Sequence, residues 1–180
     1  MDDLTKYEYK LLIELGNEIV NRTWEAGLHN QKGWKKPAGG ASRKAKEEWI
    51  KSKYVWKGFL EYNDEDGGPD DRQAKISVEM YEAAKRGDLL AIQEALAKGG
   101  SVEWRNEAER GRTALHVCVL AMPEDENDME SWKGTQCAEL LIQNGAKLTC
   151  EDYDHHKALD CAVVRNGRRE MIEYLSARSS

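Results

Sequence analysis

The side chains that could bind a metal or act as nucleophiles are few and scattered. They are Cys118, Cys137, Cys150, Cys161, His29, His116, His155 and His156. A metal site could draw on the four that lie between positions 150 and 161, but no Cys-x-x-Cys pair anchors it, so we expect no metal. We expect Cys118, Cys137 and Cys161 to be buried thiols that pack as small apolar side chains.

Patterns typical of other catalytic chemistry are missing or weak. No histidine forms a recognisable pair with a Ser or Cys nucleophile. A Gly-x-x-x-x-Gly-Lys-Ser/Thr nucleotide-binding loop does not occur, and Gly39-Gly40-Ala41-Ser42 is too short for a dinucleotide fingerprint. The many Asp and Glu residues occur in runs typical of solvated surface, whereas acid–base catalysis needs a shielded pair. We therefore predict that the chain is not an enzyme.

One basic segment could meet an anionic partner. Its positive residues are Lys32, Lys35, Lys36, Arg43, Lys44, Lys46, Lys51, Lys53 and Lys57, and Trp34, Trp49 and Trp56 lie among them. We single out Lys32, Lys35, Lys36, Arg43 and Lys44 as a candidate patch for anionic lipid, since a nearby anionic membrane attracts each charge by about 1 kcal/mol. The favoured alternative is a solvated helix face balanced by Glu47 and Glu48. Trp34 could lie at the membrane interface, whereas we expect Trp49 and Trp56 to anchor the core.

The N-terminal segment has the pattern of one helix. Asn17, Asn21 and Trp24 recur at spacings that place them on one face, and we predict a buried amide network there. A neighbouring apolar stripe is formed by Tyr7, Leu11, Leu12, Leu15 and Ile19.

Three ordered blocks carry a family resemblance. They are Gly16-Asn17-x-x-x-Asn21-x-x-Trp24-Glu25-Ala26, then Lys36-Pro37, then Glu47-x-Trp49-Ile50-x-x-Lys53-Tyr54-x-x-x-x-Phe59. This order resembles the C-terminal half of an Arf GTPase-activating (ArfGAP) domain, over about residues 4–62. The resemblance implies structural roles for Asn17, Asn21, Trp24, Trp49 and Tyr54.

The C-terminal part contains an internal repeat. Gly111-Arg112-Thr113-Ala114-Leu115-His116 resembles the Gly-x-Thr-Pro-Leu-His signature of an ankyrin repeat, with Ala114 in place of proline. Related copies surround Met80 and Leu159, 35 positions before and 44 after Leu115, so the middle copy holds an insertion of roughly ten residues, given a period of about 33. In this signature His116 has a structural role, hydrogen bonded to loop backbone.

Each copy predicts two packed helices. Small Ala83, Ala84 and Ala162 allow close approach, and we expect Gly87 and Gly167 to supply turns at positive φ. No repeat can bury its apolar face alone, so three copies are near the minimum for a stable stack. We hypothesise that the preceding helical segment covers the first repeat as an N-terminal lid.

These observations predict an all-α chain in three parts: residues 1–62 as the ArfGAP-like helical half, an acidic linker at 63–76, and three ankyrin repeats at 77–180. The acidic Asn63–Arg72 stretch with Gly-Gly-Pro is expected to be non-helical. A second acidic loop, at 123–128, is either part of a binding face or a plain surface excursion, which we favour.

Candidate partner-binding residues of the repeats are Trp104, Arg105, Asn106, Arg110 and Trp132, since Trp and Arg are enriched in binding hot spots. Trp104 could equally pack under its own loop.

Composition limits the function classes. The net charge is −6 and 33% of residues are charged, which argues against nucleic-acid binding. The N-terminus lacks a secretory pattern, and no apolar stretch approaches the roughly 18 residues that span a bilayer. We expect a cytoplasmic protein whose membrane contact, at endosomes or the plasma membrane, is peripheral.

The combined resemblance is to multidomain ArfGAP proteins with coiled-coil, ankyrin and PH regions, which act on Arf-family GTPases in membrane trafficking. The resemblance therefore implies a GTPase as an alternative to lipid for the patch formed by Lys32, Lys35, Lys36, Arg43 and Lys44. In that family a four-cysteine zinc finger and a catalytic arginine precede the matched segment, and no residue here corresponds to them. We therefore expect no cofactor and no GTPase-activating activity from this chain alone, whether it is a fragment or a degenerate relative. The alternative is a free-standing ankyrin module with an unrelated partner.

Overall fold

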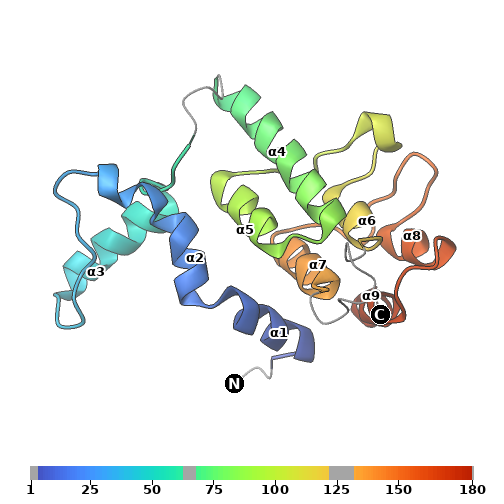
Figure 1. The fold of residues 1–180 in the computed structure, drawn as a ribbon, viewed down its shortest axis with the longest axis horizontal. Helices are drawn as coiled ribbons and strands as arrows, with labels where there is room; N and C mark the ends of the chain where they lie inside the picture. Colours follow the sequence, from blue (N-terminus) through green and yellow to red (C-terminus); the bar gives the residue numbers. More distant parts are fainter. Residues whose placement is uncertain (1–3, 63–67, 122–131, 180) are drawn as a thin grey trace. The chain divides into compact units, whose positions relative to one another are not determined.

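The computed structural model describes residues 4–62, 68–121 and 132–179, which form helices and loops without a β-strand (Figure 1). The helices are α1 (Lys6–Leu15), α2 (Asn17–Trp24), α3 (Arg43–Ile50), α4 (Pro69–Arg86), α5 (Leu89–Lys98), α6 (Ala114–Cys118), α7 (Gly134–Gln143), α8 (Ala158–Val164) and α9 (Arg169–Ser179). Short turns are η1 (Ala26–Asn30), the π-helical η2 (Lys51–Val55) and η3 (Glu107–Glu109). The expected all-α class is confirmed, while the acidic loop at 123–128 lies outside the described residues.

The chain forms two compact units. We call residues 1–14 with 68–180 the repeat unit, and residues 15–67 the basic unit. The N-terminal residues therefore join the body formed by the C-terminal part, whereas the sequence pattern placed them with residues 15–62. The reason is that α1 packs on α9.

The repeat unit is built from three helix pairs, α4 with α5, α6 with α7, and α8 with α9. The first helices pack in the order α4, α6, α8 and the second helices in the order α5, α7, α9 (Figure 1). Side chains between the layers are almost fully buried; they include Met80, Ile92, Leu115, Leu141 and Leu175. This is the stack that three mutually supporting repeats require.

The two helix-connecting glycines have different physical roles. Gly87 ends α4 in the left-handed conformation, with φ of 72°, as expected. The expectation for Gly167 is wrong, because the positive φ in that turn belongs to Asn166, at 53°. A Cβ at Gly167 would lie 2.8 Å from the backbone oxygen of Ala162, so glycine permits a close approach there.

The expected non-helical linker ends earlier than predicted, because α4 begins at Pro69. Proline suits the first helical turn, since its missing N–H has no partner there in any case. Asp70 and Asp71 also lie in that turn, where carboxylates interact favourably with the helix dipole. The same residues that looked like a solvated spacer therefore start a helix of 18 residues.

The predicted N-terminal helix is interrupted at Gly16, which has φ of −25° and ψ of 159° and begins α2 as its N-cap. Glycine is a weak helix former and is tolerated at the N-cap. The apolar stripe is therefore divided. Leu11 is buried in the repeat unit and Leu15 in the basic unit, while Leu12 is 58% exposed.

One face of α1 packs on the second-helix layer of the repeats. The Tyr7 ring meets the Tyr174 ring of α9 edge to face, with centroids 4.6 Å apart. Lys10 pairs with Glu170, also of α9, at 3.0 Å, and Glu14 pairs with Lys133 just before α7. The spacing of these residues explains why Leu11 is only 4% exposed.

The core of the basic unit is aromatic. The Trp49 ring, 7% exposed, packs against the rings of Phe59 and Trp34, with centroids 4.8 and 6.5 Å away. Gly27 donates its backbone N–H to the Phe59 oxygen at 2.8 Å. A Cβ at Gly27 would lie 3.0 Å from the Leu60 oxygen, so this turn also depends on glycine.

The prediction that Asn17 and Asn21 form a buried amide network is wrong, because only Asn21 takes part in a network. Asn17 is exposed, and Asn21 instead accepts a hydrogen bond from the ammonium of Lys53. Lys53, with a side chain only 4% exposed, also pairs with Glu25 at 2.6 Å. Burial raises the pKa of Glu25, but hydrogen bonds from Lys53 and Lys36 outweigh this, so its pKa is lowered overall.

Trp56 does not anchor the core as expected and is 66% exposed. In an α-helix, seven positions would return Trp56 to the face of Trp49. The π-helical turn η2, closed by the bond from the Trp56 N–H to the Lys51 oxygen at 2.9 Å, uses more residues per turn. The chain therefore rotates Trp56 outward.

Candidate protein-binding site

The loops that precede α6 and α8 have a common architecture. Each closes with an isolated antiparallel bridge, Asn106 with Arg112 in one and Glu151 with Lys157 in the other. Near the tip of each loop a non-glycine residue has positive φ, namely Arg110 at 64° and His155 at 61°. Successive repeats therefore present two similar loops side by side.

Arg105 joins the two loops. One guanidinium nitrogen donates to the backbone oxygens of Gly111 at 2.9 Å and Glu151 at 2.8 Å. A second guanidinium nitrogen, Nη2, lies 3.0 Å from the Cys150 sulfur. Since these contacts occupy the guanidinium, Arg105 acts mainly as a cross-link that fixes the spacing of the loops.

Between the loops lies a groove of about 570 Å³. It is lined by Val102, Glu103, Arg105, Thr113, Lys147, Thr149, Cys150 and Glu151. Glu103 and Lys147 form a salt bridge at 2.5 Å, with side chains 60% and 67% exposed. An exposed pair of this kind contributes only about 0–1 kcal/mol, so a partner could replace it at little cost.

Under the groove, His116 ties the two loops from inside. Its Nδ1 accepts a hydrogen bond from the Thr113 N–H at 3.2 Å, so Nε2 carries the proton and donates to the His156 oxygen at 3.1 Å. Burial lowers the pKa of His116, with partial compensation from the His156 oxygen and from Asp152. The ring is a structural element of the loop pair.

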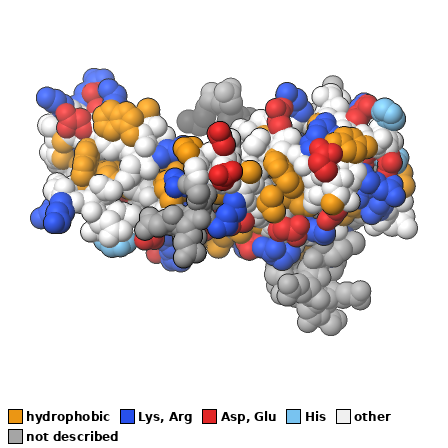
Figure 2. All heavy atoms as spheres, turned by 90° about the horizontal axis from the view of Figure 1, so that it is seen from above, with side chains coloured by type: hydrophobic (Ala, Val, Ile, Leu, Met, Phe, Trp, Pro, Cys, Tyr) orange, Lys and Arg blue, Asp and Glu red, His pale blue; other side chains and the backbone are white. Residues whose placement is uncertain are grey.

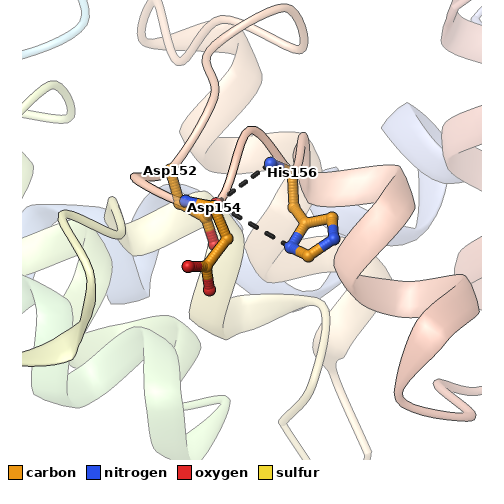
Figure 3. Close-up of side chains that lie close together, drawn as sticks. All are labelled: Asp152, Asp154 and His156. Atoms are coloured by element: carbon orange, nitrogen blue, oxygen red, sulfur yellow. Dashed lines mark hydrogen bonds and ion pairs between the residues drawn. The ribbon is translucent and has the colours of Figure 1, made fainter.

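Asp152, Asp154 and His156 lie close together in the second loop, as Figure 3 shows. Oδ1 of Asp152 accepts the backbone N–H groups of Asp154 at 2.9 Å and His156 at 3.0 Å. Oδ2 of Asp152 faces the Arg112 guanidinium at 3.3 Å, and Asp154 pairs with Arg110. Because backbone donors and arginines already satisfy these carboxylates, the cluster organises the loop.

Burial raises the pKa of Asp152, and the hydrogen bonds from His156 and Arg112 outweigh that effect, so the pKa is lowered overall. The carboxylate is therefore held in its charged form as an acceptor within the loop.

Most of the predicted partner-binding residues have internal contacts. Asn106 caps η3 by accepting the Ala108 N–H at 3.1 Å. The half-buried Trp104 ring packs edge-on against the Tyr81 ring, with centroids 5.6 Å apart. These two residues support the loop that carries them.

Trp132 likewise has internal partners. Its indole N–H donates to the Ala121 oxygen at 3.0 Å, and its ring stacks under the Arg168 guanidinium at 4.5 Å. Trp132 therefore anchors the chain at the start of α7. The groove residues Glu103, Lys147 and Thr149 were missed, because nothing local marks them and only the stacking of two repeats brings them together.

The candidate basic patch is only partly available. Lys36 pairs with Glu25 at 3.1 Å, and Arg43 pairs with Glu47 at 2.7 Å. Lys32, Lys35 and Lys44 are exposed and form no ion pair within the described part of the chain.

Comparison with known proteins identifies an ankyrin repeat at residues 110–153, the range that contains α6 and α7. The chain is 39% identical to Arf-GAP with coiled-coil, ANK repeat and PH domain-containing protein 2 of Oryctolagus cuniculus, over 86% of this chain and 28% of that protein. The Homo sapiens protein of that name gives the same identity and coverage. The Gallus gallus protein is 50% identical over 52 residues, which are 29% of this chain and 6% of that protein.

The chain therefore spans less than a third of the length of these relatives, since the widest of these alignments covers 28%. It contains an ankyrin repeat and is homologous to Arf-GAP proteins that carry ANK repeats. Within the residues that the structure describes, no helix combines the length and the apolar character needed to cross a bilayer.

Proposed function

We propose that the chain is a protein-binding scaffold within the Arf-GAP family, acts in Arf-regulated membrane trafficking, and binds a partner segment in the groove between the loops before α6 and α8. The observation that carries this proposal is the groove itself, held open by the Arg105 cross-link. Loops presented side by side by stacked repeats are typical protein-binding surfaces.

The chemistry of the groove indicates the kind of segment it fits. Glu103 and Lys147 offer one charge of each sign at its edge, while Thr113 and Thr149 offer hydroxyl groups and Val102 an apolar contact. An extended polar segment with an acidic and a basic side chain would exchange the internal salt bridge for two intermolecular ones. The first partner to test is an Arf-family GTPase, because the relatives carry Arf-GAP in their names.

A binding assay tests the groove. The purified chain is titrated with an Arf protein loaded with a non-hydrolysable GTP analogue, and Lys147→Glu is compared with Arg169→Glu. Arg169 is an exposed, ion-paired control on α9, away from the groove residues. We expect Lys147→Glu to weaken binding about tenfold, which corresponds to 1.4 kcal/mol, and the control to leave it unchanged. If both variants changed Arf binding equally, the groove would not be the binding site. If the folded chain did not bind Arf at all, a free-standing module with an unrelated partner would be favoured.

We also propose that the chain by itself does not accelerate GTP hydrolysis. The four cysteines provide no Cys-x-x-Cys pair for a zinc finger, and no arginine matches the catalytic position of the family. An arginine finger accelerates hydrolysis by about 10³–10⁵-fold, so its contribution is easily measured. In a single-turnover assay on GTP-loaded Arf, we expect the same rate with and without the chain. A clear acceleration would refute this part of the proposal.

A further inference from the structure

The basic unit exposes a set of apolar side chains on one short segment. Ile50 is 53% exposed, Val55 68% and Trp56 66%, with Tyr54 at 46% beside them. On the surface formed by residues 15–62, Figure 2 shows apolar side chains next to Lys and Arg. Single exposed apolar residues need no explanation, but a tryptophan and two aliphatic residues exposed within seven positions concentrate apolar surface on this segment, which we call the apolar patch.

The inward side of this segment is fixed, so the exposed side chains are held in place. Lys53 is buried and bonded to both Asn21 and Glu25. The N–H of Gly58 then donates to the Ser52 oxygen at 2.9 Å and closes the turn. Rolling the patch inward would require Lys53 to leave its carboxylate partner, which makes the outward orientation of Trp56 a stable feature.

Lysines flank the patch. Lys44 lies seven positions, or two helical turns, before Lys51, so the two lysines share one face of the helix. Lys57 follows Trp56 directly in the chain. Lys44 and Lys51 are exposed and form no ion pair among the described residues. Residues 15–62 contain ten Lys and Arg against five Asp and Glu, although the whole chain has a net charge of −6. The positive charge is thus concentrated in the segment of the chain that also carries the exposed apolar side chains.

The composition of the patch favours a membrane over a protein partner. Lysine is depleted in protein–protein interfaces, where arginine is enriched. At membrane surfaces, tryptophan lies at the headgroup level and lysine extends its ammonium to the phosphates. We propose that Ile50, Val55 and Trp56 form a wedge that inserts into the headgroup region of an anionic membrane, held there by Lys44, Lys51 and Lys57. This surface is independent of the groove proposed above.

Vesicle co-sedimentation of the full chain tests the wedge, with phosphatidylcholine vesicles compared with mixed phosphatidylcholine–phosphatidylserine vesicles. We expect binding only to the mixed vesicles, about tenfold weaker for Trp56→Ser and for Lys51→Glu. Val55→Asp should also weaken binding, whereas Val164→Asp should not. Val164 is a matched control, since it is a valine on α8 with 66% exposure.

Insertion has its own readout in the quenching of tryptophan fluorescence by brominated lipid. Trp56→Phe keeps an apolar ring, so we expect this variant to bind mixed vesicles but to lose much of the quenching. This test does not depend on whether Val55→Asp folds. The wedge is refuted if wild-type chain binds neither vesicle, binds both equally, or binds mixed vesicles unaffected by Trp56→Ser. It is also refuted if Trp56→Ser weakens only Arf binding, because the patch would then be a protein interface.

Discussion

The placement of α1 on the repeats makes a sharp prediction about two adjacent leucines. Leu11 is 4% exposed and lies on the face that carries Tyr7 and Lys10, whereas Leu12 is 58% exposed. Truncating a buried leucine to alanine removes about 0.8 kcal/mol per methylene and adds a cavity term, for a usual total of about 2–5 kcal/mol. Since Leu11 packs at the edge of the stack, we expect Leu11→Ala to lower the free energy of unfolding by about 3 kcal/mol. Leu12→Ala should change it by less than about 0.5 kcal/mol.

Urea unfolding of the full chain, followed by far-UV circular dichroism, measures both changes. With an m-value of about 1–3 kcal/mol/M, Leu11→Ala should move the midpoint by about 1–3 M. If α1 detaches before the repeats unfold, Leu11→Ala can lower the stability only by as much as the docking of α1 contributes. Hydrogen exchange of the α1 amides measures this detachment step. Equal midpoints for the two variants, or α1 amides without protection in the wild-type chain, would refute the packing of α1 on α9.

A double-mutant cycle provides a second measure of the same contact. Tyr7 and Tyr174 meet edge to face, so their coupling energy should be about 0.5–1.5 kcal/mol. A coupling indistinguishable from zero would place α1 elsewhere.

Three further predictions concern a buried ring, a buried charge and a turn. Burial lowers the pKa of His116, so the stability that the neutral ring contributes above the unfolded pKa of about 6.5 is lost as the pH falls below that value. His116→Gln should therefore reduce the fall of the urea midpoint below about pH 6.5, and an unchanged pH dependence would contradict the buried neutral ring. Lys53→Met leaves Glu25 without its buried partner and should lower the free energy of unfolding by about 3 kcal/mol, the low end of the usual range of about 3–5 kcal/mol, because Lys36 still pairs with Glu25. Thermal unfolding measures the loss, and no loss would contradict the buried pair. Gly167→Ala forces a Cβ against the backbone of α8 and should cost about 1–3 kcal/mol, whereas Gly39→Ala meets nothing within 4 Å; equal melting temperatures would refute the close approach.

Several features could be predicted from residues near one another in the chain. Thr113 and His116 mark the start of a repeat, and the structure shows their reciprocal hydrogen bonds at the N-terminus of α6. Gly87 marked the end of α4 for a similarly local reason. Such signals are readable because a cap or a turn depends on only a few consecutive residues.

The functional surfaces were harder to predict. Arg105 and Trp132 belong to residue types enriched in binding sites. In the structure, however, Arg105 contacts Glu151 and Trp132 contacts Arg168, so both side chains have internal partners far along the chain. Glu103 and Lys147 carry no local signal and become one site only when folding brings together the loops that precede α6 and α8. Residue type alone could not separate an exposed anchor from a structural one.

Periodicity and local motifs were enough to predict the all-helical class, and the concentration of positive charge in residues 15–62 can be read directly from the residues. The three repeat copies stay a prediction, which the ankyrin match at residues 110–153 supports for the middle copy. The folded chain was needed to show that α1 joins the repeat unit, that Lys53 lies buried while Trp56 faces outward, and that a groove lies between two loops. The physical reason is one of range: capping, periodicity and charge are properties of neighbouring residues, whereas the buried face of a helix depends on partners that folding brings from far along the chain.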